Sequence, residues 1–316
     1  MPEGDTVLRT ATRLHQALAD RVLTRTELRW ADLGGVDLAG RRVVEVRSHG
    51  KQILTRIGAA PDASGRRFET VSAEPLTLRS HLRMEGRWAI VPPGDEHWPR
   101  PGGVAVRAVL GNQDWTAVGS WLGLLDLIPT AEEPSLIGHL GPDILAPDFP
   151  VSGLPESVRR LAAGPDRHLG AALLDQTTVA GIGTMYMAET LFLQRLSPWT
   201  RVGDADLDAV LRRARRLLER GATQSVQTTT HDSRPGMRTF VHARSGRPCH
   251  RCGTTVRVAM IGPVLKERTA FWCPTCQPGP VPTDDGRPQT PLGSEPRSRR
   301  FGDASRRPAS GYRPRR

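Results

Sequence analysis

The order of hydrophobic and polar positions predicts a chain that begins with one helix and continues as a series of strands. Apolar residues recur at helical spacing between Val7 and Leu18, which predicts an amphipathic first helix that Asp5 can cap. From Val22 to about Gly119, short runs rich in Val, Ile, Leu and Thr are broken by Gly, Pro and Asp. This pattern is typical of an antiparallel β-sandwich or barrel.

The second half of the chain has a different pattern. The segment between about residues 128 and 154 is rich in Pro and Gly, which predicts a linker. Helical periodicity follows from Pro155 to Gly221, and a basic loop then leads to four cysteines. We therefore predict an α+β protein made of an amino-terminal helix with a β-sandwich (1–127), a linker (128–154), a helical domain (155–237), a cysteine-bearing hairpin (238–277) and a disordered tail (278–316).

The composition agrees with a folded protein of two or three domains. The chain has 316 residues, of which 38% are hydrophobic, and a mean hydropathy of -0.39. Its apolar stretches are all shorter than the roughly 18 residues of a membrane span, and the amino terminus lacks a secretory pattern. We expect a cytoplasmic protein with no membrane partner.

The charge balance predicts a polyanionic partner. Lys and Arg number 44 against 33 Asp and Glu, a formal net charge of +11, and nucleic acid is the polyanion that fits best. We therefore expect association with the nucleoid. The tail from Pro278 is rich in Pro, Gly, Ser and Arg and cannot form a core, so it either adds nonspecific attraction to phosphates or has no role.

The four cysteines form two pairs, Cys249 with Cys252 and Cys273 with Cys276, and twenty residues separate the pairs. This spacing predicts one tetrahedral zinc site with a hairpin between its two halves, and two disulfides are the alternative. Four thiolates leave no open coordination position, so a zinc ion here is structural. The hairpin carries three basic residues: Arg257, Lys266 and Arg268.

A glycine-rich turn stands between two of the predicted helices. Gly181 and Gly183 precede a helix that Thr184 can cap. A turn of this kind can present backbone N–H groups to a phosphate at the helix amino terminus. It can also be a tight connection between helices without any ligand.

The first residues also admit two interpretations. Pro2 and Glu3 suit the first turn of a helix, where the missing N–H of proline costs nothing and an acid faces the positive end of the dipole. Removal of Met1 would instead leave Pro2 with a free secondary amine, which is a nucleophile. The local sequence alone favours the structural interpretation.

Several motifs in a fixed order resolve this ambiguity. PEG at the start, HGKQIL, SHLRMEG, LGPDIL, LLDQTTVAGIGTMY and the two CxxC pairs ending in FWCPTCQ resemble the family of formamidopyrimidine-DNA glycosylase and endonuclease VIII. The likeness runs from Met1 to about Gln277. It implies a bifunctional DNA glycosylase and AP lyase of base excision repair, with a catalytic β-sandwich domain, a helix-two-turn-helix DNA-binding domain and one structural zinc ion.

The resemblance implies a role for each matching residue. Pro2 would attack C1′ of the damaged nucleotide, Glu3 would act as general acid, and Lys51 would lie beside the lesion phosphate. Met84 matches an intercalating wedge, flanked by Arg83 and Glu85, although a methionine of this kind can also pack in a core. Further DNA contacts would come from the turn and the hairpin, through Gly181, Gly183, Thr184 and Arg268.

The chain departs from the family pattern at several positions. Asp5 and Thr6 replace a proline and a second glutamate, and the Arg-Phe pair of the purine-specific branch is absent from VGSWLGLLDL. The absence of that pair favours oxidised pyrimidines and abasic sites in damaged duplex or single-stranded DNA, with no obligate protein partner. The alternative is a noncatalytic binder of damaged or structured nucleic acid on the same scaffold. A tautomerase that uses Pro2 as base is a poor fit, because such chains need neither zinc nor phosphate contacts.

Overall fold

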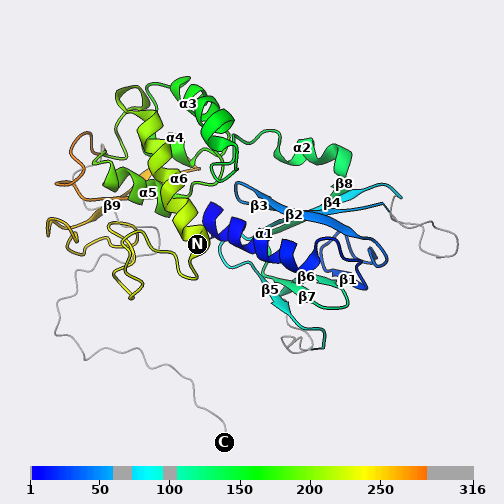
Figure 1. The fold of residues 1–316 in the computed structure, drawn as a ribbon. Helices are drawn as coiled ribbons and strands as arrows, with labels where there is room; N and C mark the ends of the chain where they lie inside the picture. Colours follow the sequence, from blue (N-terminus) through cyan, green and yellow to red (C-terminus); the bar gives the residue numbers. More distant parts are fainter. Residues whose placement is uncertain (1, 60–72, 95–104, 283–316) are drawn as a thin grey trace, which may run out of the picture.

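The computed structural model describes residues 2–59, 73–94 and 105–282, and the structural statements below concern these residues. A β-sandwich forms one side of the molecule, and a group of helices with a small hairpin forms the other side (Figure 1). The amino terminus lies between the two parts, where the first helix meets α6 (Leu207–Thr223). The α+β architecture predicted from the sequence is therefore confirmed.

Two antiparallel four-stranded sheets make the sandwich. Apolar side chains from both sheets share one core, which includes Ile53 and Leu78 from one sheet and Ala108 and Ala117 from the other. The strand LLDLIP was not among the predicted strands, because it lacks alternation and adjoins the Pro-rich segment. The first sheet has the order β1 (Arg25–Leu28), β6 (Val106–Gly111), β7 (Thr116–Ser120), β5 (Arg87–Val91), and the second has the order β2 (Val43–His49), β3 (Gln52–Ile57), β4 (Leu76–His81), β8 (Leu124–Pro129).

Helix α1 (Gly4–Leu18) packs its apolar face into the same core and also contacts α6. Its N-cap residue is Glu3, and no side chain caps the helix. The prediction that Asp5 caps α1 is therefore wrong. Asp5 lies inside the first turn, and its side chain is buried, because the helical part of the protein packs against this end of α1.

The helical part contains the elements that the periodicity predicted. Helix α5 (Thr184–Leu193) is buried along nearly its whole length, which fits a sequence that is apolar on all sides. The predicted linker carries the short helix α2 (Glu133–Ile137), after one turn of 3₁₀-helix (Thr130–Glu132), and one turn of π-helix (Phe149–Gly153). The remaining helices are α3 (Leu154–Ala162) and α4 (Leu169–Leu174), and a 3₁₀ turn (Val202–Asp204) precedes α6.

The hairpin predicted between the cysteine pairs is present. Strand β9 (Arg257–Ile261) pairs with β10 (Arg268–Trp272) in antiparallel register. Its apolar side packs on Ala188 and Phe192 of α5, so the hairpin is mounted on that helix. The predicted disordered tail lies outside the described residues from position 283 onward. None of the helices that the structure describes has the length and apolar character needed to cross a membrane.

Candidate functional site

The side chain of Glu3 joins the two parts of the molecule. It is fully buried, and its carboxylate accepts the backbone N–H groups of Gly183 at 2.8 Å, Met185 at 2.8 Å and Tyr186 at 3.3 Å. These N–H groups belong to the first turn of α5, where a helix has no internal acceptors. A Cβ atom on residue 183 would lie 2.4 Å from Cδ of Glu3, so only glycine allows this approach. Glu3 thus caps a helix 180 residues away in sequence.

The glycine-rich turn is closed by contacts within the protein. The N–H of Gly183 donates to Glu3, and the N–H of Gly181 donates to Gln176 at 3.1 Å. Thr184 is the first residue of α5 and is buried, and its side chain does not cap the helix. The predictions of a Thr184 cap and of two N–H groups free for a phosphate are therefore wrong, because side chains of the protein occupy those positions. Contact of this turn with DNA through other atoms stays a prediction.

Lys51 lies on the turn between β2 and β3 and is brought close to Glu3 and Arg268. Burial lowers the pKa of Lys51 below its usual value; the carboxylate of Glu3 opposes this shift and Arg268 adds to it. Gly50 seats the turn against the segment that precedes α5, since its N–H donates to Asp143 and a Cβ there would lie 2.7 Å from Cβ of Ala180. Three of the residues predicted from the resemblance therefore form one cluster.

Burial dominates the electrostatics of Glu3. It raises the pKa of the carboxyl group above its usual value, while the charge of Lys51 and the N–H donors of α5 pull in the other direction. An acid with a raised pKa retains its proton closer to neutral pH than an exposed glutamate does. This is the property required of a general acid.

Pro2 stands at the edge of an open pocket of about 650 Å³. Its lining includes Thr6 of α1, Met185 of α5, and Gln227 and His242 from the segment after α6. Burial lowers the pKa of His242 to about 4, so its ring is neutral at physiological pH. The pocket is wide enough for a group much larger than water and opens beside the residue that carries the candidate nucleophile.

Two buried carboxylates hold the pocket loop, defined here as residues 225–244. Asp5 accepts a hydrogen bond from Oη of Tyr186 at 2.9 Å and from Nε2 of Gln227 at 2.9 Å and 3.0 Å. Burial raises the pKa of Asp5 above its usual value. The pocket loop is therefore tied directly to the first turn of α1.

Glu189 of α5 holds the other end of the pocket loop. Its carboxylate accepts the N–H groups of Phe240 at 2.8 Å, Val241 at 2.9 Å and His242 at 2.9 Å, and the hydroxyl of Thr229. The side chain is fully buried. Neither Glu189 nor Asp5 was predicted as a site residue. For Glu189 the sequence did contain a signal, because a carboxylate in a helix that is apolar on all sides must find buried donors.

The turn between β4 and β5 carries Arg83, Met84 and Glu85, all exposed. Met84 is 64% exposed, which excludes the alternative that it packs in the core. His81 holds the start of this turn, because its ring Nδ1 accepts the N–H of Arg83 at 2.9 Å. Burial lowers the pKa of His81 to about 4, and the charges of Arg83 and Lys51 add to this effect.

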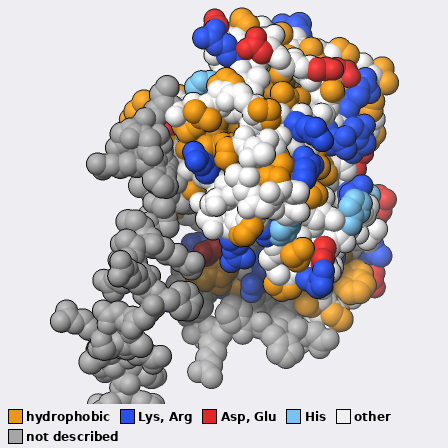
Figure 2. Space-filling view, turned by 90° about the vertical axis from the view of Figure 1, so that its left-hand side faces the viewer, with side chains coloured by type: hydrophobic (Ala, Val, Ile, Leu, Met, Phe, Trp, Pro, Cys, Tyr) orange, Lys and Arg blue, Asp and Glu red, His pale blue; other side chains and the backbone are white. Residues whose placement is uncertain are grey.

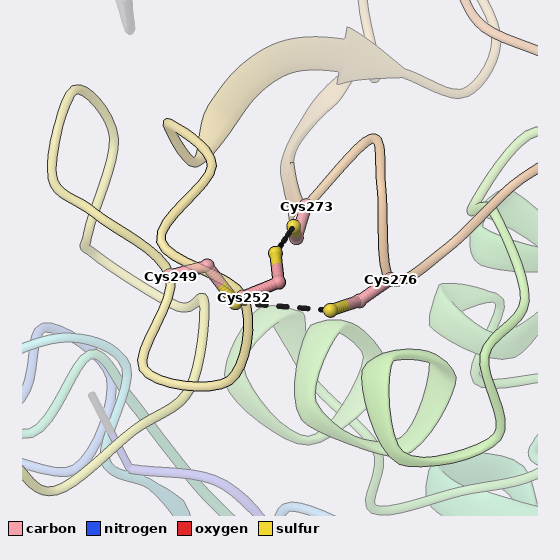
Figure 3. Close-up of side chains that lie close together, drawn as sticks. All are labelled: Cys249, Cys252, Cys273 and Cys276. Atoms are coloured by element: carbon pink, nitrogen blue, oxygen red, sulfur yellow. Dashed lines mark hydrogen bonds between the residues drawn. The ribbon is translucent and has the colours of Figure 1, made fainter.

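The four cysteine sulfurs converge at the base of the hairpin (Figure 3). They all lie within 4.8 Å of one another, with 3.4 Å between the sulfurs of Cys252 and Cys273. A tetrahedral zinc ion with bonds of about 2.3 Å separates its sulfur ligands by roughly 3.8 Å, so the four residues fit a metal ion. All four cysteines are free, and this geometry disfavours the alternative of two disulfides.

Comparisons with known proteins identify the family. Residues 1–118 match the family model described as the formamidopyrimidine-DNA glycosylase N-terminal domain, and residues 140–233 match the formamidopyrimidine-DNA glycosylase H2TH domain. The chain is 45% identical over 291 residues to "Probable endonuclease 8 2" of Streptomyces coelicolor, covering 91% of this chain and 98% of the relative. It is 37% identical over 278 residues to the "DNA-(apurinic or apyrimidinic site) lyase Nei2" of Mycolicibacterium smegmatis, covering 88% and 99%.

The fold also matches solved structures. A complex of the Lactococcus lactis Fpg protein with THF-DNA and an inhibitor aligns with a TM-score of 0.67 at 20% identity, covering 88% of this chain and all of that one. A second structure, of the Lactococcus lactis formamidopyrimidine DNA glycosylase with DNA containing an AP site, gives the same TM-score at 19% identity. Together with the family models and the relatives, these matches show that the chain belongs to the formamidopyrimidine-DNA glycosylase and endonuclease VIII family.

Proposed function

We propose that this protein is a bifunctional DNA glycosylase and AP lyase of base excision repair that favours oxidised pyrimidines. One observation carries the proposal: Pro2 stands at the edge of the pocket, while the next residue, Glu3, is a buried carboxyl group beside Lys51. The candidate nucleophile thus adjoins a space that can take an extruded nucleotide, and the residue that follows it is a candidate proton donor whose charge interacts with Lys51. The family membership supports the same reaction.

The reaction begins once removal of Met1 has freed the amine of Pro2. An α-amino group has a pKa of about 8, against about 10.4 for a lysine, so much more of it is neutral near pH 7. Its nitrogen attacks C1′, the N-glycosidic bond breaks, and the electron pair leaves with the base. The proton that the Pro2 nitrogen then gives up balances the negative charge of the departing base. Glu3 donates a proton to the sugar oxygen as the ring opens, which leaves an iminium ion, the Schiff base of a secondary amine, between Pro2 and C1′.

The Schiff base then promotes strand cleavage. Loss of a proton from C2′ expels the 3′ phosphate, and a second elimination releases the 5′ phosphate. Lys51 and Arg268 supply positive charge where the lesion phosphates would lie. Arg83, Met84 and Glu85 would fill the gap that the extruded base leaves in the duplex, which fits the exposure of their turn.

DNA with a damaged base or an abasic site is the proposed partner, as duplex or single strand, without a membrane or an obligate protein partner. The net charge of +11 favours a polyanion, and basic side chains are spread over the face of the molecule shown in Figure 2. The Lactococcus lactis proteins of the same fold were solved with such DNA. Gly181, Gly183 and Thr184 are buried, so a contribution of their turn to DNA binding stays a prediction.

Trapping of the Schiff base tests the proposal. Borohydride added to the protein and DNA with an abasic site or thymine glycol should reduce the iminium and leave a covalent adduct. Pro2→Gly should weaken trapping, whereas Glu156→Gln, a change in a half-buried residue of α3 that pairs with Arg159 and Arg160, should leave it unchanged. The absence of an adduct on every lesion, from protein whose mass shows that Met1 has been removed, would leave only the noncatalytic binder.

We also propose that the four cysteines hold one zinc ion with a structural role. Cys249, Cys252, Cys273 and Cys276 would occupy all four positions of a tetrahedral ion, which would fix the hairpin that carries Arg268. Elemental analysis should find one zinc per chain in the native protein and none in Cys252→Ser. A different metal, or full loading of the variant, would contradict the assignment.

A further inference from the structure

Asp5 has an environment that the reaction described above does not use. Its carboxylate is fully buried among hydrogen-bond donors: Oη of Tyr186, Nε2 of Gln227 and the backbone N–H of Thr6. A Cβ on Gly221 of α6 would lie 2.8 Å from Oδ2 of Asp5, so α6 closes the remaining side. Asp5 is therefore shielded from the pocket and can reach a substrate only through another residue.

The residue that connects Asp5 to the pocket is Gln227. Its side-chain amide has one donor end and one acceptor end. Nε2 donates to both oxygens of Asp5, at 2.9 Å and 3.0 Å, and the same residue lines the Pro2 pocket. An ionised carboxylate only accepts hydrogen bonds, so Asp5 fixes which end of the amide faces it. Among the described residues, none donates a hydrogen bond to Oε1 of Gln227.

A second contact keeps this arrangement in place. Arg9, one turn after Asp5 on α1, donates to the backbone oxygen of Gly221 at 3.0 Å and to that of Gln224. The start of the pocket loop is thus held at residue 224 by Arg9 and at residue 227 by Asp5. A loop held at two points, by the half-buried Arg9 and the buried Asp5, presents the amide of Gln227 in one orientation, at low entropic cost on binding.

We propose that Asp5 is a positioning residue that orients the Gln227 amide, so that its carbonyl oxygen reads an N–H group on the extruded base. This inference rests on the proposed function, because it assumes that the pocket beside Pro2 receives the base. The ligand class is a base with a ring imide or exocyclic N–H donor, such as a ring-saturated thymine. An abasic nucleotide has no base, so its cleavage does not depend on this contact.

Two single-turnover rates separate this role from a structural one: base release from DNA with 5,6-dihydrothymine, and cleavage of a preformed abasic site. Gln227→Leu should lower base release roughly tenfold, the loss expected for one hydrogen bond to the base. Asp5→Asn should cause a loss of similar size. The asparagine amide can donate a hydrogen bond to Oε1 of Gln227, so the Gln227 side-chain amide is free to flip. Both variants should cleave the abasic site within about twofold of the wild-type rate. Asp20→Asn, the same change in an exposed residue just beyond α1, is the matched control.

A substrate change tests the hydrogen bond itself. Methylation of N3 of dihydrothymine removes the imide donor, so the wild-type protein should release this base about tenfold more slowly, while Gln227→Leu should not discriminate between the two bases. Equal losses on lesion and abasic DNA would show that Asp5 only supports the fold, and unchanged base release would show that Gln227 does not read the base. Either result overturns the inference. Failure of the wild-type protein to cleave abasic DNA would instead overturn the proposed function.

Discussion

Two regions of the molecule hold their buried carboxylates with different kinds of hydrogen-bond donor. One region is the sandwich, which Glu133 braces, and the other surrounds α5 and contains three carboxylates. Glu133 accepts hydrogen bonds from two arginines, with Nη2 of Arg56 at 2.7 Å and Arg47 close by, and from Thr77. Its pKa is lowered to about 2, chiefly by Arg56. By contrast, the hydrogen bonds to Glu3, Asp5 and Glu189 come from backbone N–H groups, hydroxyls and an amide. Burial raises the pKa of all three.

Because of this difference, Glu133 acts as a structural brace with a fixed charge, whereas the carboxyl groups around α5 can change their protonation state. Two guanidinium groups fix the charge of Glu133, which then joins α2 to strands β2, β3 and β4. Neutral donors organise a carboxylate without fixing its charge to the same extent, so desolvation can bring its pKa toward neutral pH. The general-acid role proposed for Glu3 requires that freedom to give up and regain a proton. Asp5 and Glu189 share the environment because both tie the pocket loop to the helices that carry the site.

The largest expected effect is the loss of Glu189. Glu189→Ala would leave three backbone N–H groups and the hydroxyl of Thr229 without their acceptor in the interior. We expect a loss of about 4 kcal/mol in the free energy of unfolding, since each unsatisfied buried donor costs about 1 to 3 kcal/mol and water can relieve some of them. Urea denaturation measures the change, with Glu219→Ala on the exposed side of α6 as control. A loss below about 1 kcal/mol would show that the four contacts contribute little.

Sequence reasoning identified the site wherever the information was local. Cysteine spacing named four residues whose sulfurs prove to lie together, and the motifs around Glu3, Lys51 and Arg268 named three residues whose charges interact. Rules based on neighbouring residues failed where a side chain forms its hydrogen bonds with a segment far away in the sequence. Asp5 has the position and chemistry of a helix cap, yet its partners lie 181 and 222 residues away.

The same reason explains the error at the glycine-rich turn. A GxG before a helix predicts free N–H groups, and only the folded chain shows that Glu3 takes one of them. The partners of Glu189 were equally hidden, because the loop that supplies them has no periodicity. The exposure of Met84, in contrast, could not be decided from its sequence neighbours but follows at once from its place in a tight turn.

A smaller effect is expected from Glu133→Gln, with a defined pH dependence. A carboxyl group whose pKa falls from 4.5 in the unfolded chain to about 2 in the folded protein stabilises the fold above pH 4.5, and this contribution is lost as the pH falls toward 2. We expect a loss of about 3 kcal/mol at pH 7 that shrinks as the pH is lowered from 5. Denaturation at several pH values measures it, with the exposed neighbour in Glu132→Gln as control. A loss that does not vary with pH would contradict the ion-pair explanation.

The smallest effect, and the sharpest contrast with Glu133, is expected from Asp5→Asn. Because the pKa of Asp5 is raised in the folded protein, its contribution is fully present below the unfolded value of 3.8 and is lost as the pH rises through the folded pKa. The wild-type protein should therefore lose its advantage over Asp5→Asn as the pH rises, whereas its advantage over Glu133→Gln grows. At pH 7 the free energies of unfolding of the wild-type protein and Asp5→Asn should differ by only about 1 kcal/mol. Asparagine keeps one acceptor for Tyr186 and avoids a buried charge. If both variants changed with pH in the same direction, the two regions would not hold their carboxylates by different means. The stability difference between the wild-type protein and each variant should therefore change with pH in opposite directions for Glu133→Gln and Asp5→Asn. That result would establish that two arginines lower the pKa of a buried carboxyl group, whereas burial among neutral donors raises it.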